Sequence, residues 1–364
     1  MFEELAKKLT PWLLGDGPQA GIVLSTRVRL ARNIKGMIFP SRATPERRLK
    51  VLEIVKTALS KTKAYRGTLV SSADLHNLDR DFLVERHLIS PEFMREKDGQ
   101  GVFISQDESV SIMVNEEDHL RIQALKSGFQ LKQCYQEVSS LAKELSHYIN
   151  FEHDSQFGYL TACPTNVGTG LRGSLLIHLP GLVLTRKIDD FITRVSKSGF
   201  AVRGFYGEGS DVAGNLFQIS NQNTLGRSEE EILSDLEKLA LEVIADEESA
   251  RNAIFKDAKE EIEDKIWRSY GILRHARLLS SSEVMNLLSA LRLGVGRKVL
   301  EDLSLPQINE VLFLCQPAHL QKYYNKQMDA QERDVSRAEL VRSKLSAPNK
   351  NGGKKRKNRA EEEK

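Results

Sequence analysis

The chain is poor in cysteine and has no long apolar segment, and both absences limit what it can be. Its 364 residues include only three cysteines, Cys134, Cys163 and Cys315, which are too scattered for a disulfide framework or a C-x-x-C metal site. We therefore expect a protein of the reducing cytoplasm. No apolar run of about 18 residues occurs, and residues 1–20 lack a basic segment followed by an apolar core, so we expect neither a membrane span nor an export signal.

The common motifs that bind nucleotide phosphates are also missing. There is no G-x-x-x-x-G-K-[ST] loop, and the His-Arg-Asp and Asp-Phe-Gly motifs of protein kinases do not occur. Residues 168–173 fit G-x-G-x-x-G, but the short apolar run 175–180 that follows ends in proline and predicts a strand, whereas a dinucleotide-binding turn opens a helix. If the chain binds a nucleotide, arginines must hold most of its phosphate charge.

Positive charge is concentrated at the C-terminal end of the sequence. The net charge is +3, and residues 350–364 contribute +4 from seven Lys/Arg and three Glu, so the remainder carries −1. A body of this charge argues against a nucleic-acid partner. We expect residues 347–364 to form a disordered basic tail.

The length of the chain exceeds what one hydrophobic core usually serves, so two domains are expected. Strand-like and helical patterns alternate up to about residue 255, and beyond it the sequence is largely helix-forming. The pattern predicts one domain over residues 1–255 and a helical C-terminal domain over residues 256–346.

The most informative stretch runs from Cys163 to Arg172. It combines a thiol, two closely spaced glycines that allow backbone N–H groups to approach a ligand, and an arginine that can fork onto phosphate oxygens. This composition predicts an anion-binding loop.

A pair of arginines, Arg27 and Arg29, lies near the start of the chain. Alternation over residues 27–30 places both guanidinium groups on one face of an extended segment and apolar side chains on the other. Two adjacent like charges favour a bound anion, although a solvated strand face would give the same pattern.

An acidic cluster within residues 115–121 contains Glu116, Glu117 and Asp118 beside His119. Three carboxylates after an apolar strand are costly unless they are used or paired, which indicates a functional site. An acidic helix N-terminus stays open as an alternative. A metal site has less support, because no second pair of ligands occurs at metal spacing.

These motifs resemble those of the phosphagen (guanidino) kinase superfamily. Four ordered segments carry the similarity: Ser25 to Arg29, Asn115 to Arg121, Cys163 to Arg172, and Arg203 to Asn221. More narrowly, the chain is similar to the bacterial protein arginine kinases. Few residues precede Arg27, where phosphagen kinases have a helical domain that encloses a small substrate. In addition, residues 214–222 and the helical extension match that branch, and residues 333–338 resemble its R-D-x-x-R-A phosphoarginine-binding motif.

The resemblance implies an α+β fold, in which an antiparallel sheet flanked by helices precedes a helical C-terminal domain. It also implies ATP-dependent phosphorylation of arginine side chains in proteins, with Mg²⁺ brought by the nucleotide and no dedicated metal ligands. Position by position, it assigns the ATP phosphates to Arg27, Arg29, Arg121, Arg172 and Arg203. It implies that Glu117 and Glu208 clamp the acceptor guanidinium and supply the base, and that Cys163 lies beside that guanidinium. Phosphoarginine binding is assigned to Arg333, Asp334 and Arg337.

The partners implied by the resemblance are protein substrates that bear arginine, a zinc-binding McsA-like activator, a Clp ATPase and further copies of the chain in a homodimer or higher oligomer. The modification would mark proteins for degradation in protein quality control and the stress response.

One position departs from the family, because the histidine near adenine is replaced by Leu176. His87 is expected to be a surface or core residue rather than a ligand. A non-catalytic phosphoarginine-binding adaptor and a kinase of a small free guanidino compound stay open as alternatives.

Overall fold

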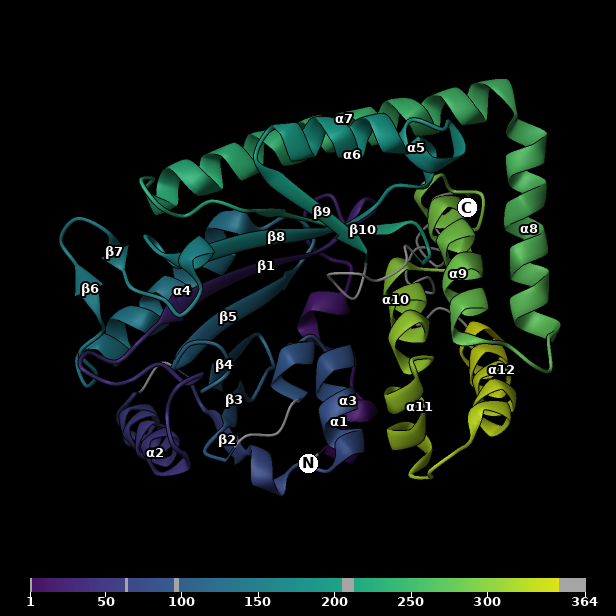
Figure 1. The fold of residues 1–364 in the computed structure, drawn as a ribbon. Helices are drawn as coiled ribbons and strands as arrows, with labels where there is room; N and C mark the ends of the chain where they lie inside the picture. The colour runs from purple at the N-terminus through teal and green to yellow at the C-terminus, as the bar shows by residue number, and fades with distance from the viewer. Residues whose placement is uncertain (1, 63–64, 95–97, 205–212, 347–364) are drawn as a thin grey trace, which may run out of the picture.

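An eight-stranded antiparallel sheet forms the centre of the protein (Figure 1). The computed structural model describes residues 2–62, 65–94, 98–204 and 213–346. The strand order is β2-β3-β4-β5-β1-β8-β10-β9. These strands are β1 (Val23–Arg32), β2 (Gly67–Ser71), β3 (Gly101–Ser105), β4 (Val110–Val114), β5 (Leu120–Ser127), β8 (Leu171–His178), β9 (Phe200–Gly204) and β10 (Leu216–Asn221), and β6 (His153–Asp154) pairs separately with β7 (Gly158–Tyr159).

Helices flank this sheet and continue beyond it toward the C-terminus. They are α1 (Phe2–Ala6), α2 (Pro45–Lys61), α3 (Asn77–Glu85), α4 (Leu131–Ser146), α5 (Pro180–Leu184), α6 (Ile188–Lys197), α7 (Glu229–Asp257), α8 (Lys259–His275), α9 (Ser281–Gly296), α10 (Leu305–Leu314), α11 (Pro317–Tyr324) and α12 (Ala330–Ser346). The α+β class expected from the sequence is confirmed. None of the helices described here is both long and apolar enough to cross a bilayer.

Helices α4 and α7 cover one face of the sheet and bury its apolar residues. Val28 and Leu30 of β1 join the core that these helices form with the sheet, and Cys134 of α4 is fully buried in it, as its helical spacing predicts. Helix α7 begins with the expected capping box, in which Ser228 accepts from the Glu231 N–H and the Glu231 side chain accepts from the Ser228 N–H. Because side chains alternate along a strand, Arg27 and Arg29 must face the opposite side from Val28 and Leu30.

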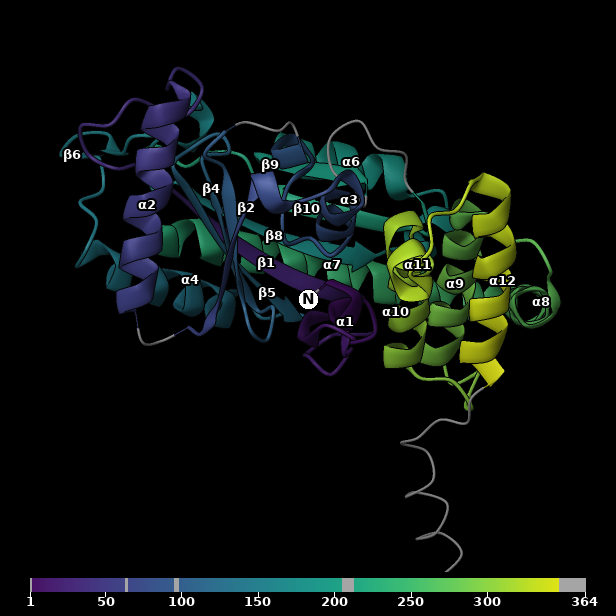
Figure 2. The same ribbon diagram turned by 90° about the horizontal axis from the view of Figure 1, so that it is seen from below.

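Helices α8 to α12 gather at one end of the sheet, as both views show (Figure 1, Figure 2). Their apolar side chains share a second core with Trp12 and with Leu24, Leu176 and Leu216 of the sheet. Helix α7 continues through residue 255 to Asp257 before α8 begins. The division at residues 255 and 256 therefore falls inside a helix and stays a prediction, and the proposed tail from residue 347 lies outside the described residues.

A buried polar contact ties α3 to the C-terminal helices. The Glu85 carboxylate accepts hydrogen bonds from the backbone N–H groups of Ala318 and His319, both at 2.8 Å, and so caps the start of α11. Beside it, the Arg86 guanidinium donates two bonds of 2.7 Å to the Glu108 carboxylate. The segment that follows α3 is thereby fixed between the sheet and α11.

Candidate active site

Four arginines from β1, β5 and β8 share the face of the sheet that α4 and α7 leave uncovered. Arg29 lies opposite Arg172 of β8, and Arg121 of β5 lies opposite Ala31, which follows Arg29 on the same face of β1. Arg27 precedes Arg29 by two residues and therefore has the same orientation. The register thus brings together side chains that are far apart in the sequence.

Arg203 extends this face by two further strands. It lies opposite Gln218 of β10, which in turn lies opposite Leu176 of β8. Gln218 also accepts a hydrogen bond of 3.3 Å from Nη2 of Arg27. All five arginines named by the sequence therefore lie on one side of one sheet.

The crowding of these guanidinium groups is electrostatically unfavourable in the free protein. Burial, with the charges of Arg121 and Arg172, lowers the pKa of Arg27 to about 9. Burial and the same kind of repulsion hold the pKa of Arg29 well below its ordinary value. The Nε of Arg29 is buried, and it has no hydrogen-bond partner among the described residues. An anion on this face would supply the missing countercharge.

Glu116 provides part of that countercharge from within the protein. Both of its carboxylate oxygens accept a bond of 2.7 Å from Nη1 of Arg121, and the Ser90 hydroxyl donates to it as well. Although burial opposes the shift, Arg121 lowers the pKa of Glu116. The Glu116 carboxylate therefore holds the Arg121 guanidinium in its orientation.

Glu117 is the exposed member of the acidic cluster. Residues 115–119 form the connection between β4 and β5, which rules out the helix N-terminus left open by the sequence. The residues on both sides of Glu117 are buried, whereas Glu117 itself is exposed. Partial desolvation, together with the charge of Asp118, raises the pKa of the Glu117 carboxyl. The turn therefore presents a carboxyl group with an elevated proton affinity.

The loop that begins at Cys163 reaches the sheet through its glycines. A Cβ on Gly168 would lie 2.4 Å from the carbonyl oxygen of Thr224, and one on Gly170 would lie 2.7 Å from that of Ala31, and both residues have positive φ. The N–H of Gly168 donates to the Tyr159 carbonyl. The glycines thus serve close backbone packing, and the expectation that they free N–H groups for a ligand is wrong for Gly168.

Cys163 itself is half-buried at the start of this loop. Its Sγ lies 3.0 Å from the Thr165 hydroxyl. After the loop, β8 runs from Leu171 to His178, so a strand follows the G-x-G-x-x-G sequence, as its flanking residues predict.

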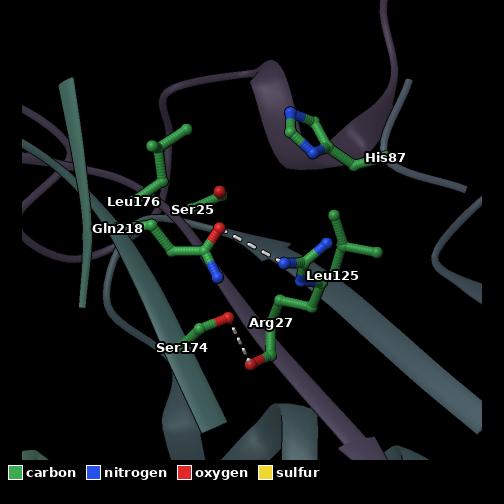
Figure 3. Close-up of a pocket in the computed structure, with 7 residues that line it drawn as sticks. All are labelled: Ser25, Arg27, His87, Leu125, Ser174, Leu176 and Gln218. Carbon is green, nitrogen blue, oxygen red and sulfur yellow. Dashed lines mark hydrogen bonds between the residues drawn. The ribbon is translucent and has the colours of Figure 1, made fainter. Parts of the chain in front are cut away.

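A pocket at one end of the arginine face contains a residue that the sequence did not identify. Figure 3 shows His87 reaching over this pocket toward Arg27, with Leu176 and Gln218 on the neighbouring strands. Burial, followed by the charge of Arg27, lowers the pKa of His87 to about 3, so its imidazole is neutral. The ring of His87 packs against those of Trp12 and Phe313, as expected of a core residue, and it also lines the same pocket as Leu176.

The hexapeptide of residues 333–338 lies on α12, in the helical region. Arg337 is only 1% exposed, and it donates hydrogen bonds to the carbonyl oxygens of Cys315 at 2.8 Å and Leu279 at 2.7 Å, and to the Asp334 carboxylate at 2.5 Å. Arg333 and Asp334 are partly exposed. Arg337 is thus anchored in the protein, and its two motif partners lie nearer the surface.

Glu208, the other predicted acceptor residue, lies outside the described residues. Arg203 is near the end of the last segment before that gap. Of the three residues expected to contact the acceptor guanidinium, the structure therefore describes Glu117 and Cys163.

Comparisons with known proteins match this arrangement along most of the chain. The ATP:guanido phosphotransferase C-terminal catalytic domain matches residues 50–250, and the protein-arginine kinase McsB C-terminal domain matches residues 259–357. A protein-arginine kinase of Symbiobacterium thermophilum is 46% identical over 95% of this chain and 99% of its own length. One from Halothermothrix orenii is 43% identical over 93% and 97%, respectively.

A solved structure shares the fold of about two thirds of the chain. The duplicated taurocyamine kinase from Schistosoma mansoni, with bound transition state analog components, has a TM-score of 0.59 and 27% identity, over 67% of this chain and 35% of that protein. The chain therefore belongs to the ATP:guanido phosphotransferase family and, within it, to the protein-arginine kinases.

Proposed function

We propose that the arginine face binds the phosphates of ATP, through Arg27, Arg29, Arg121, Arg172 and Arg203. The observation that carries this proposal is the placement of the five arginines on one face of the sheet, where burial and then the charges of neighbouring arginines lower the pKa of Arg27 and of Arg29. Forked guanidinium groups also suit phosphate oxygens better than point charges do. The pocket beside His87 encloses only about 20 Å³, so a nucleotide would lie mainly across the open face.

On this proposal the acceptor guanidinium binds at the side of the site formed by Glu117 and Cys163, with Glu208 as the second carboxylate. A guanidinium has a pKa above about 12 and is a poor nucleophile until a carboxylate orients it and removes a proton. The raised pKa of Glu117 favours its action as such a base. Cys163 would position the guanidinium and would form no covalent bond.

The reaction would be a direct in-line transfer. A guanidinium nitrogen attacks the γ-phosphorus, the bond from phosphorus to the bridging oxygen breaks, ADP leaves, and the nitrogen's proton passes to a glutamate. Mg²⁺ bound to ATP would neutralise charge on the phosphates. The arginines hold the phosphates in place while that charge redistributes.

We further propose that the C-terminal motif binds phosphoarginine. Arg333 would take the phosphate and Asp334 the guanidinium, while the buried Arg337 fixes Asp334 through their ion pair. Binding there would regulate activity on proteins. A Clp ATPase that degrades the modified proteins, a McsA-like activator and self-association belong to this proposal as partners.

The choice of acceptor can be tested with two substrates. We expect Mg-ATP to phosphorylate arginine side chains of an unfolded protein and to leave free arginine largely unmodified, as read by mass spectrometry under non-acidic conditions. Efficient phosphorylation of free arginine would instead support a kinase of small guanidino compounds. No transfer to either acceptor, with retained binding of a phosphoarginine peptide, would support an adaptor.

A further inference from the structure

We propose that Asn33 is a positioning residue, which couples the turn bearing Glu117 to the loop bearing Cys163. This inference rests on the proposed roles of those two residues. Asn33 follows β1 directly and is fully buried. None of the motifs recognised in the sequence includes it.

The Asn33 amide connects three segments of the chain. Its Nδ2 donates to Oδ1 of Asp118 at 2.6 Å and to the carbonyl oxygen of Leu160 at 3.0 Å. Its Oδ1 accepts from the backbone N–H of His119 at 2.8 Å. Both donor hydrogens and the acceptor oxygen are therefore engaged, which a carboxylate or a hydroxyl at this position could not reproduce.

Asp118 extends the connection to the residue before the thiol. The same Oδ1 that accepts from Asn33 also accepts from the backbone N–H of Ala162 at 2.7 Å. Glu117 precedes Asp118, and Cys163 follows Ala162. Glu117 and Cys163 are therefore each one residue from an atom held in this network.

His119 makes a second tie between the turn and the segment after β1. Its Nδ1 accepts from the backbone N–H of Ile34 at 3.0 Å, so its Nε2 carries the hydrogen and donates to the Ile38 carbonyl at 3.0 Å. The imidazole fixes the turn against the chain. The Asn33 and Asp118 pair, in contrast, also reaches the loop that bears Cys163 through the N–H of Ala162.

This arrangement separates two effects of losing Asn33. The arginine face depends on the pairing of β1 with β5 and β8, which ends before Asn33. Nucleotide affinity should therefore persist. The geometry of Glu117 and Cys163 around the acceptor should deteriorate, and misplacement by about 1 Å can cost about 100-fold in rate.

The test measures kcat, the KM for ATP and the Kd for ADP in Asn33→Asp, Asp118→Asn and the double variant. Asn33→Asp keeps the shape but loses both donors, and we expect kcat to fall at least about tenfold, with the ADP Kd changed less than twofold. In the double variant, the amide nitrogen at position 118 can donate to the carboxylate at position 33, so the repulsion between two carboxylates in Asn33→Asp is removed, although the bond from the Ala162 N–H is lost. We therefore expect the double variant to recover part of the lost kcat.

Asn309→Ala is the matched control for the loss of a buried amide. Asn309 is also fully buried, and it bonds to Arg292 and to the Leu13 carbonyl, away from the arginine face. Asn33→Ala and Asn309→Ala should both lower stability, and only Asn33→Ala should lower kcat at unchanged ADP affinity. Should Asn33→Ala fail to fold, the double-variant series decides.

Two outcomes would overturn the inference: a wild-type kcat in Asn33→Asp, or a double variant whose loss is the full product of the two single losses. A wild-type kcat in Glu117→Gln is a different failure. It would overturn the proposed role of Glu117 and hence the basis of the inference, whatever the Asn33 variants do.

Discussion

Arg29 of β1 and Arg172 of β8 lie directly opposite each other on one face of the sheet. Like charges in this cross-strand position destabilise a folded protein, and burial adds to the cost. The free protein thus carries an unfavourable cluster of charge that a bound phosphate chain would stabilise. Such a cost is expected at a functional site, where stability is sacrificed for binding.

Replacing Arg29 by methionine should separate the cost of this charge to stability from its benefit to phosphate binding. We expect Arg29→Met to raise the free energy of unfolding of the nucleotide-free protein by about 0.5–2 kcal/mol, because a buried repulsive charge is removed. The same change should weaken ADP binding at least about tenfold. Urea denaturation and calorimetry measure the two quantities, and a less stable variant with unchanged ADP affinity would count against the proposed phosphate site.

Lysine at position 172 tests whether forked geometry matters on this face. Arg172→Lys keeps the positive charge but loses the planar fork, so we expect both ADP affinity and turnover to fall severely. Titration calorimetry with ADP and steady-state kinetics check this. Unchanged values would indicate that the arginines form only a solvated basic surface.

The neighbouring carboxylates Glu116 and Glu117 should behave differently when each is changed to glutamine. Glu117→Gln should lower kcat by about 100-fold or more while ADP binding persists, since a general base contributes roughly that much. Glu208→Gln should act in the same way. Glu116→Gln leaves Arg121 without its paired charge and should alter ADP affinity. Identical effects of Glu116→Gln and Glu117→Gln on kcat and on ADP binding would contradict the division of roles.

His87 should make the protein sensitive to acid. Its pKa is about 3 in the folded protein and near 6.5 in the unfolded chain, so the unfolded state binds more protons between these values. The contribution to stability is fully present above pH 6.5 and is lost as the pH falls toward 3. We expect His87→Gln to reduce the loss of unfolding free energy between pH 7 and pH 5 by about 1–2 kcal/mol. Denaturation curves at the two pH values check this, and an unchanged loss would show that the imidazole is already protonated in the fold.

Arg337 and Arg333 should also differ, although both belong to the phosphoarginine motif. Arg337→Ala removes a buried guanidinium that bonds two carbonyls and Asp334, and should cost about 3 kcal/mol of stability. Arg333→Ala should cost much less, because its side chain is partly exposed, and should still weaken phosphoarginine binding. Equal losses of stability would mean that Arg337 is not the structural anchor.

The sequence predicts a local feature of this fold well where the residue pattern is compatible with a single structure. The placement of Arg27 and Arg29 on the face opposite Val28 and Leu30 and the burial of Cys134 follow from side-chain periodicity and are confirmed. The capping box at Ser228, which follows from the Ser-x-x-Glu spacing, is confirmed as well. The acidic turn was ambiguous, because carboxylates suit a helix N-terminus as well as a strand connection. The pairing of β4 with β5 on either side of that turn decides it.

Long-range contacts could not be predicted from local patterns. His87 reaches the pocket because Arg86 and Glu85 fix the end of α3, and this requires Glu108 and α11 to be in place. Asn33 cannot be identified from the sequence, because a single buried amide has no sequence periodicity. The positions of these residues are therefore set by contacts between residues 22 to 233 positions apart in the sequence.

The most direct test of the account is the formation of phosphoarginine on a protein acceptor by the wild type and by Glu117→Gln, each shown to bind ADP. With Mg-ATP and a non-acidic quench, mass spectrometry should detect phosphoarginine from the wild type, in amounts equal to the ADP released. Glu117→Gln should release almost no ADP and form almost no phosphoarginine. A wild-type yield from Glu117→Gln, or ADP release by the wild type without phosphoarginine, would contradict the proposed transfer.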